Sequence, residues 1–162
     1  MNEYVAVIHF SEPKLLVLGP YATEKANAVA SQVGTTLQLD VEFECLKPKR
    51  GGGRDMYQAL KSELRAYLID TKRLDPSGDY QTVALEARPK YPDLEQVTHF
   101  RKQYLAADSL YDVLQFTVSN PLGIPETTHV KMGRPFGRFT FAARTSLAAI
   151  YHFEKTLYAV LR

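Results

Sequence analysis

Residues 37–45 alternate strictly between apolar and polar side chains, and this pattern constrains the fold more than any other part of the sequence. The apolar set is Leu37, Leu39, Val41, Phe43 and Cys45, and the positions between them carry Gln38, Asp40, Glu42 and Glu44. A period of two residues is typical of a β-strand with one buried face and one solvated face. The sequence therefore predicts a strand that contributes an apolar face to a core and an acidic face to solvent.

The residues before this strand predict two further strands and a helix. Two apolar runs over residues 4–10 and 14–18 are separated by Ser11-Glu12-Pro13 and indicate a β-hairpin. From Thr23 to Val33 apolar residues recur at helical spacing, and Gly34 follows at the position of a C-terminal cap. Residues 1–46 are thus expected to form a ββαβ unit, which is too small to bury much core alone.

Helical and strand patterns are mixed in residues 55–162. They predict a helix that starts at Asp55 and continues to Lys72, a strand over residues 80–87, a helix capped by Asp93, a strand over residues 136–143, and a last helix opened by Thr145 or Ser146. Residues 110–118 fit either a helix or a strand. We therefore predict an α+β fold: a single compact domain, residues 1–162, with a mixed or antiparallel sheet packed by three or four helices. A basic, glycine-rich loop over residues 47–54 would join its two parts.

The composition is typical of a globular domain, because 45% of the 162 residues are apolar. A net charge of +2 means that any nucleic-acid site must rest on local clusters of cations. Cys45 is the only cysteine, which excludes an internal disulfide and favours a reducing compartment. No apolar run approaches the roughly 18 residues of a membrane span. We expect a soluble, cytoplasmic protein without membrane contacts.

Cations and glycines cluster directly before the helix predicted at Asp55. The cluster comprises Lys47, Lys49, Arg50, Gly51, Gly52, Gly53 and Arg54. Backbone N–H groups and the helix dipole favour an anion at such a position, so the cluster is a candidate phosphate or carboxylate site. If the helix reaches Lys72, then Arg54, Lys61, Arg65 and Lys72 form one row about 27 Å long, a length that suits a polyanion.

A second basic stretch over residues 129–144 contains Arg134 and Arg138 and no acidic residue. Its phenylalanines Phe136, Phe139 and Phe141 can stack nucleic-acid bases, or they can fill a sheet core. The helical row can equally be a solvated face, and Asp40, Glu42, Glu44 and Asp55 can neutralise the loop internally. The predicted anion site comprises Lys47, Lys49, Arg50, Gly52, Gly53, Arg54, Lys61, Arg65, Lys72, Arg134 and Arg138.

No sequence pattern indicates catalysis. The histidines His9, His99, His129 and His152 are scattered singly, and neither metal-ligand spacing nor a nucleophile motif is present. Cys45 ends the apolar face of a predicted strand, which favours a buried structural side chain over a reactive thiol. We therefore predict no catalytic residue, no metal and no cofactor.

Two local resemblances extend these expectations. The segment Arg50-Gly51-Gly52-Gly53-Arg54, placed between a strand and a helix, resembles the pyrophosphate-binding turn of GNAT acetyltransferases, with matches at Arg50 and Gly53. That resemblance implies an acyl-coenzyme A-dependent N-acyltransferase. Tyr4-Val5-Ala6-Val7, the turn from Leu18 to Thr23 and the alanine-rich helix after it resemble small uncharacterised proteins of actinobacteria and their phages. That resemblance implies an accessory protein, phage-encoded or phage-like.

Three functions follow from these observations, in order of preference. The first is a non-catalytic binding protein whose basic loop and helix contact nucleic-acid phosphates. The second is a protein-interaction or assembly module that binds an acidic protein surface or a second copy of the chain. The third is the acyl-coenzyme A-dependent transferase.

Overall fold

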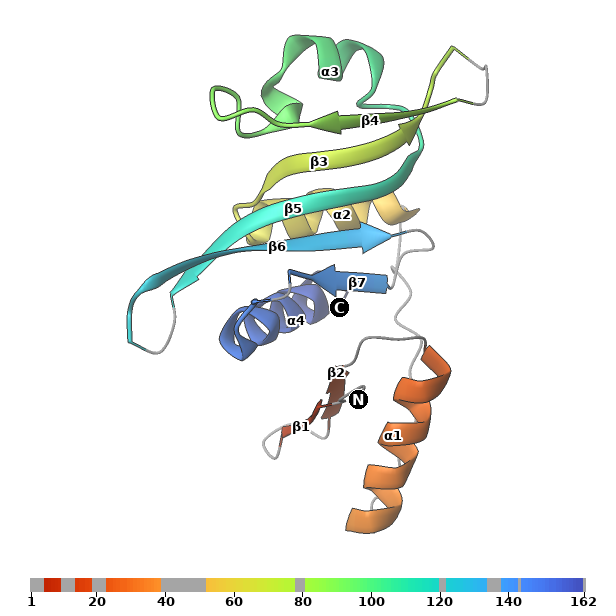
Figure 1. The fold of residues 1–162 in the computed structure, drawn as a ribbon, viewed down its shortest axis with the longest axis vertical. Coiled ribbons are helices and arrows are strands. Elements are labelled where there is room, and N and C mark those ends of the chain that lie inside the picture. Colours follow the sequence, from red (N-terminus) through yellow and green to blue (C-terminus); the bar gives the residue numbers. More distant parts are fainter. Residues whose placement is uncertain are drawn as a thin grey trace. The chain divides into compact units, whose positions relative to one another are not determined.

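The computed structural model describes residues 5–9, 14–18, 23–38, 52–77, 81–119, 122–133, 138–142 and 144–161. The chain divides into two compact units, Met1–Cys45 and Leu46–Arg162, each with its own strands and helices (Figure 1). The α+β class predicted from the sequence is confirmed. The boundary between the units falls where the sequence predicts the end of the ββαβ unit.

The first unit contains a hairpin and a helix. Strands β1 (Val5–His9) and β2 (Lys14–Leu18) form the predicted antiparallel hairpin, and the structure places Val5 opposite Leu18. Helix α1 (Thr23–Leu37) begins at the predicted residue and contacts both strands. The strand predicted over residues 37–45 lies outside the described residues, except that Leu37 and Gln38 belong to the helix and the turn that ends it.

Helix α1 does not stop at Gly34, and the predicted cap there is wrong. The helix continues to Leu37, and within its last turns the hydroxyl groups of Thr35 and Thr36 donate hydrogen bonds to the carbonyl groups of Ser31 and Gln32. Gln38 takes the left-handed conformation with φ 55°, and its N–H donates to the carbonyl of Thr35. A residue with positive φ after the last turn ends a helix, so Gln38 has the role expected of Gly34.

The second unit is built on a five-stranded antiparallel sheet in the order β4-β3-β5-β6-β7. Its strands are β3 (Tyr67–Leu74), β4 (Thr82–Glu86), β5 (Ser109–Ser119), β6 (Pro125–Gly133) and β7 (Arg138–Phe141). The strands predicted over residues 80–87 and 136–143 are confirmed as β4 and β7. Residues 110–118, which the sequence left open, form a strand because Asp112, Leu114 and Phe116 are buried at alternate positions.

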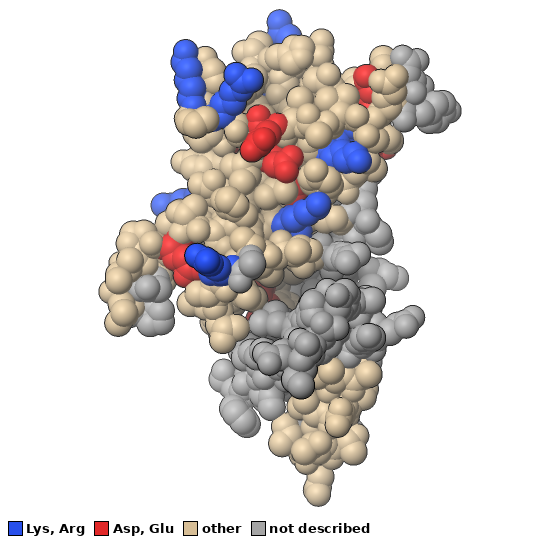
Figure 2. Space-filling view, in the orientation of Figure 1, with Lys and Arg blue, Asp and Glu red and all other residues tan. Residues whose placement is uncertain are grey.

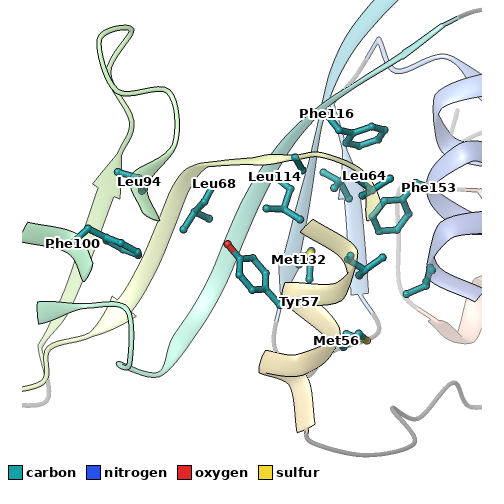
Figure 3. Close-up of a cluster of buried hydrophobic side chains, with 14 residues drawn as sticks. Met56, Tyr57, Leu64, Leu68, Leu94, Phe100, Leu114, Phe116, Met132 and Phe153 are labelled. Carbon is teal, nitrogen blue, oxygen red and sulfur yellow. The ribbon is translucent and has the colours of Figure 1, made fainter. Parts of the chain in front are cut away.

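One face of this sheet carries the core. The helices of the unit are α2 (Gly52–Glu63), the single 3-10 turn η1 (Leu94–Gln96), α3 (Thr98–Gln103) and α4 (Leu147–Leu161). Figure 1 shows α2 behind β5 and β6. Leu60 of α2 and Leu64, in the turn directly after it, join Leu114 from β5 and Phe153 from α4 in one buried cluster (Figure 3). The predicted last helix is confirmed, since Ser146 caps α4 by accepting a hydrogen bond from the N–H of Ala149.

The helix predicted from Asp55 to Lys72 is too long and starts too late. Helix α2 begins at Gly52 and ends at Glu63, where Arg65 adopts a positive φ of 49° and Ala66 donates to the carbonyl of Lys61. After this cap the chain enters β3, whose Leu68 is fully buried. The four-residue spacing of Leu60, Leu64 and Leu68 is typical of a helix. In the structure Leu68 belongs instead to β3, where a bulge places the side chains of residues 68, 71 and 73 on the same buried face.

Candidate interaction surface at the sheet edge

Much of the predicted anion site lies outside the described residues. The members of the predicted site that are not described are Lys47, Lys49, Arg50 and Arg134. Gly52, Gly53 and Arg54 form the first turn of α2, and Arg138 begins β7, but the described residues do not include their surroundings. The structure therefore fixes one relation: the basic segment is followed immediately by the N-terminus of a helix.

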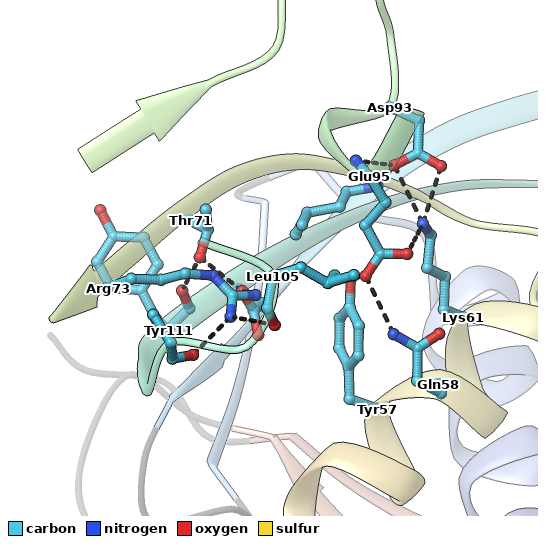
Figure 4. Close-up of polar contacts among 12 residues, drawn as sticks. Tyr57, Gln58, Lys61, Thr71, Arg73, Asp93, Glu95, Leu105 and Tyr111 are labelled. Carbon is cyan, nitrogen blue, oxygen red and sulfur yellow. Dashed lines mark hydrogen bonds and ion pairs between the residues drawn. The ribbon is translucent and has the colours of Figure 1, made fainter. Parts of the chain in front are cut away.

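Lys61 does not contribute to an exposed basic row. Its ammonium donates hydrogen bonds to both carboxylate oxygens of Asp93, at 3.0 and 2.8 Å, and to a carboxylate oxygen of Glu95 (Figure 4). The Lys61 side chain is only 11% exposed. Asp93 also accepts from the backbone N–H groups of Leu68 and Glu95, so its capping role is confirmed, on η1 rather than on a long helix.

The other two members of the predicted row are separated by the end of α2. Arg65 is exposed at the helix terminus, whereas Lys72 lies on β3, opposite Ala84 on one neighbouring strand and Tyr111 on the other. The single helical row of cations predicted from the sequence is wrong, because a helix and a strand replace the one helix it required.

The sheet face opposite the core mixes charges of both signs. Lys131 lies over the ring of Tyr111 at 3.8 Å from its centroid, and Asp70 lies directly opposite Glu86. Figure 2 shows acidic and basic side chains next to each other on this side of the molecule. Partial burial, followed by repulsion from Glu86, raises the pKa of Asp70. Such a mixture does not favour a polyanion over other ligands.

A buried polar network lies between β3, β5 and the loop after α3. The Arg73 guanidinium donates to Asp112 at 3.1 Å and to the carbonyl of Ala107 at 2.9 Å, and Asp112 also accepts from the Thr71 hydroxyl at 2.6 Å (Figure 4). Within the described part of the chain, Nε of Arg73 and the hydroxyl of Ser109 have no hydrogen-bond partner. Both residues line a cavity of about 100 Å³.

Tyr57 closes the side of this cavity nearest α2. Its hydroxyl donates to a carboxylate oxygen of Glu95 at 3.2 Å, and the side-chain amide of Gln58 donates to the same oxygen at 3.0 Å. Burial, and then the charge of Glu95, raise the pKa of the Tyr57 phenol far above its ordinary value. Tyr57 is thus held neutral as a hydrogen-bond donor. Its contact with Glu95 is typical of a buried polar network that stabilises packing between segments.

A second, larger hollow lies along β4. It measures about 230 Å³ and is lined by Leu85, Glu86, Ala87, Arg88, Tyr91, Leu94, Val97, His99, Phe100 and Tyr104. Most of these side chains are apolar or aromatic, and they come from β4, the turn after it, η1 and α3. Figure 1 shows how β4 and α3 lie beside each other at one end of the unit. We call this hollow the β4–α3 groove.

Exposed cations lie on the same segments that form the β4–α3 groove. Arg88 lines the groove itself, Lys90 lies over the Tyr91 ring at 5.6 Å from its centroid, and Arg101 and Lys102 are exposed on α3. Figure 2 shows Lys and Arg side chains gathered over the part of the second unit where α3 lies in Figure 1. An apolar hollow with a basic rim is typical of a surface that accepts an acidic, partly apolar partner.

The β4–α3 groove is not among the sites predicted from the sequence, although one segment of the sequence is typical of a binding surface. Arg88-Pro89-Lys90-Tyr91-Pro92 places cations, an aromatic residue and two prolines in a single turn directly after a predicted strand. Tyr91 is 51% exposed there. Exposed aromatic and basic residues on a rigid turn are frequent in binding surfaces.

No three metal-ligating side chains come together in the ranges that the structure describes. In those ranges, no helix has both the length and the apolar character that would be required to cross a membrane. No family model matches the chain, and no curated protein or solved structure is significantly similar to it.

Proposed function

We propose that this protein is a non-catalytic interaction module that binds an acidic partner protein in the β4–α3 groove. The observation that carries the proposal is the groove itself: an apolar hollow of about 230 Å³ bordered by Arg88 and Lys90. This is the second function inferred from the sequence, now at a different surface from the loop first considered.

The chemistry of the groove sets what the partner must offer. Burying one large apolar side chain contributes about 1.5–3 kcal/mol, which is enough for an anchor but not for a tight complex. Cations on the rim raise the association rate of an acidic partner and disfavour a basic one. The partner is therefore expected to present an apolar residue next to acidic residues.

A labelled synthetic peptide tests this proposal. The probe alternates glutamate with valine around a central phenylalanine, and a matched probe carries lysine in place of glutamate. Fluorescence anisotropy at low salt should show binding of the acidic probe alone. The double variant Arg88→Glu/Lys90→Glu should weaken binding at least about tenfold, or 1.4 kcal/mol. Lys155→Glu, on the exposed face of α4, is the matched control and should change little.

Two results would contradict the proposal. The first is equal binding of the acidic and basic probes. The second is an acidic probe whose affinity is the same for the wild type and for Arg88→Glu/Lys90→Glu.

Nucleic-acid binding is retained as a second candidate on one observation. Because α2 begins at Gly52, the cations of residues 47–50 directly precede a helix N-terminus, where backbone N–H groups favour phosphate. If Lys47, Lys49, Arg50 and Arg54 each neutralise one phosphate, the log–log salt slope on duplex DNA should be about −3.6. Titrations at several salt concentrations measure it. Unchanged affinity in Lys49→Glu/Arg50→Glu would rule this candidate out.

A further inference from the structure

We infer that the partner segment binds as an added β-strand on the outer edge of β4, with an apolar side chain in the β4–α3 groove and an acidic residue beside Arg88 and Lys90. This inference rests on the proposed function and states its binding mode. The partner is thus an extended, acidic peptide segment, and the bound state continues the antiparallel sheet by one strand.

The sheet topology leaves this edge open. In the order β4-β3-β5-β6-β7, β4 is terminal, and no other described strand pairs with its outer side. A terminal strand presents a row of backbone N–H and C=O groups to any segment that can pair with it. Addition of an extended peptide to such an edge is an established mode of recognition.

The register identifies which backbone groups face outward. Ala87 donates to the carbonyl of Ile69 at 2.7 Å, and Asp75 donates to the carbonyl of Gln81 at 2.8 Å. In antiparallel pairs the residues bonded to the neighbour alternate with residues that face away from it. The backbone groups of residues 81, 83, 85 and 87 therefore form the hydrogen bonds with β3. The N–H and C=O groups of Ala84 and Glu86 point to the open edge.

The groove follows the same residues. Leu85, Glu86, Ala87 and Arg88 all line it, so the hollow runs along the last part of the strand rather than across it. Side chains of an added strand alternate between the two faces of the sheet. A partner side chain on the face of the sheet that carries Leu85 would then enter the hollow between β4 and α3, next to Leu94 and Phe100.

The size of the groove suits one large side chain. An apolar cavity of about 150 Å³ is sufficient to hold benzene. At about 230 Å³ the β4–α3 groove has room for a phenylalanine, leucine or tyrosine side chain. Besides the tyrosines Tyr91 and Tyr104, its lining has only three polar side chains, Glu86, Arg88 and His99, so the anchor is expected to be apolar in its inner part.

Charge selects the partner and disfavours self-association. Arg88, Lys90, Arg101 and Lys102 are four exposed cations on the segments around the groove, whose own lining includes one carboxylate, that of Glu86. Two copies joined through β4 would bring like-charged rims together, whereas an acidic segment relieves their repulsion. Pro89, three residues beyond the end of β4 at Glu86, limits how far a neighbour can extend the pairing. The edge is therefore suited to a short acidic segment.

Backbone N-methylation of the acidic probe tests the binding mode. One set of peptides is methylated at alternate residues, and a second set at the intervening residues. Strand addition predicts that one set loses at least about tenfold in affinity, since its N–H groups pair with β4, while the other set binds like the parent. Equal affinity of both sets overturns strand addition. If Arg88→Glu/Lys90→Glu still weakens binding of the parent probe, the proposed function stands even though strand addition does not.

Ala84→Pro tests the protein side of the same pairing. Proline is tolerated on an edge strand where the N–H points to solvent, so the variant should keep the circular dichroism spectrum of the wild type. It removes one outward N–H and should weaken the parent probe about tenfold. Ala84→Gly changes the same side chain but keeps the outward N–H, so it is the matched control and should bind the parent probe like the wild type. If Ala84→Pro folds and binds the parent probe with wild-type affinity, strand addition is overturned. If the variant does not fold, the N-methylated peptides test strand addition without it.

Discussion

Lys61 joins two parts of the second unit that are far apart in the sequence. Its ammonium bridges Asp93 and Glu95, 32 and 34 residues further along the chain, and the three side chains are 8–16% exposed. Since Asp93 also accepts from the N–H of Leu68, one carboxylate connects α2, β3 and η1. A charge in this position stabilises the fold and is not available to a polyanion.

Replacement of Lys61 by methionine is expected to lower the free energy of unfolding by about 2–4 kcal/mol. The variant leaves two largely buried carboxylates without their counter-charge, and the penalty for an uncompensated buried charge is of this size. Urea denaturation measures the change. Lys155→Met removes an exposed lysine from α4 and should stay within about 0.5 kcal/mol of the wild type. Equal effects of the two substitutions would contradict the structural role of Lys61.

Asp70 and Glu86 are a local source of instability at neutral pH. They face each other across β3 and β4, and burial together with the charge of Glu86 raises the pKa of Asp70. The unfolded chain therefore ionises Asp70 more readily than the folded protein. The free energy of unfolding should fall as the pH rises from the ordinary pKa of an aspartate through the raised pKa of Asp70.

Asp70→Asn should remove this part of the pH dependence and raise the free energy of unfolding at neutral pH by about 0.5 kcal/mol. Like charges directly opposite on neighbouring strands are destabilising, and solvent screening keeps the gain small. Urea denaturation at acidic and at neutral pH provides the comparison. Glu63→Gln, an exposed position on α2, serves as the control. A variant less stable than the wild type at neutral pH would refute this account.

At the scale of elements, the residue at which a helix ends determines which segment is free to form the next strand. Helix α2 ends because Arg65 adopts φ 49°, and this turn directs the chain into β3. Helix α1 ends at Gln38 in the same manner. Positive φ is unfavourable for residues with a Cβ atom, so residue preference alone does not account for either helix end.

Arg65→Gly is expected to stabilise the protein by about 0.5–1 kcal/mol, because glycine adopts positive φ without strain. Arg65→Ala is the matched control: it removes the same charge but keeps the Cβ atom, so it should bring no such gain. Thermal and urea denaturation of both variants give the comparison. If glycine and alanine have the same effect, the left-handed conformation at this position is not a source of strain.

At the scale of the whole molecule, the buried apolar cluster belongs to the second unit. All its described members lie between Met56 and Leu157, on α2, the sheet, η1, α3 and α4. Neighbouring strands pair antiparallel throughout the sheet, so this unit needs no strand from residues 1–45 to complete its described pairing. It also contains the whole β4–α3 groove.

A chain shortened to residues 46–162 is therefore expected to unfold in one cooperative transition and to bind the acidic probe like the full chain. Differential scanning calorimetry and tyrosine near-UV circular dichroism measure the first property, and anisotropy the second. A fragment without a cooperative transition would show that residues 1–45 are required for the core of the second unit.

Several elements could be predicted because their signals are local. The hairpin of β1 and β2, the start of α1 at Thr23, the strands β4 and β7 and the helix after Ser146 follow from periodicity and from turn or cap residues. The helix expected through Lys72 was wrong because leucines spaced by four residues satisfy a helix and a bulged strand alike. The nucleic-acid and acyltransferase hypotheses remain predictions.

The sequence by itself determined the α+β class and the segments that form most elements, because side-chain periodicity and capping act between neighbours in the chain. Only the tertiary structure decided which charges are free. Lys61 is held by carboxylates more than 30 residues away, and the β4–α3 groove arises because β4, η1 and α3 enclose one hollow at an unpaired sheet edge. Neither relation is written in local spacing, since both depend on strand order and on packing between distant segments.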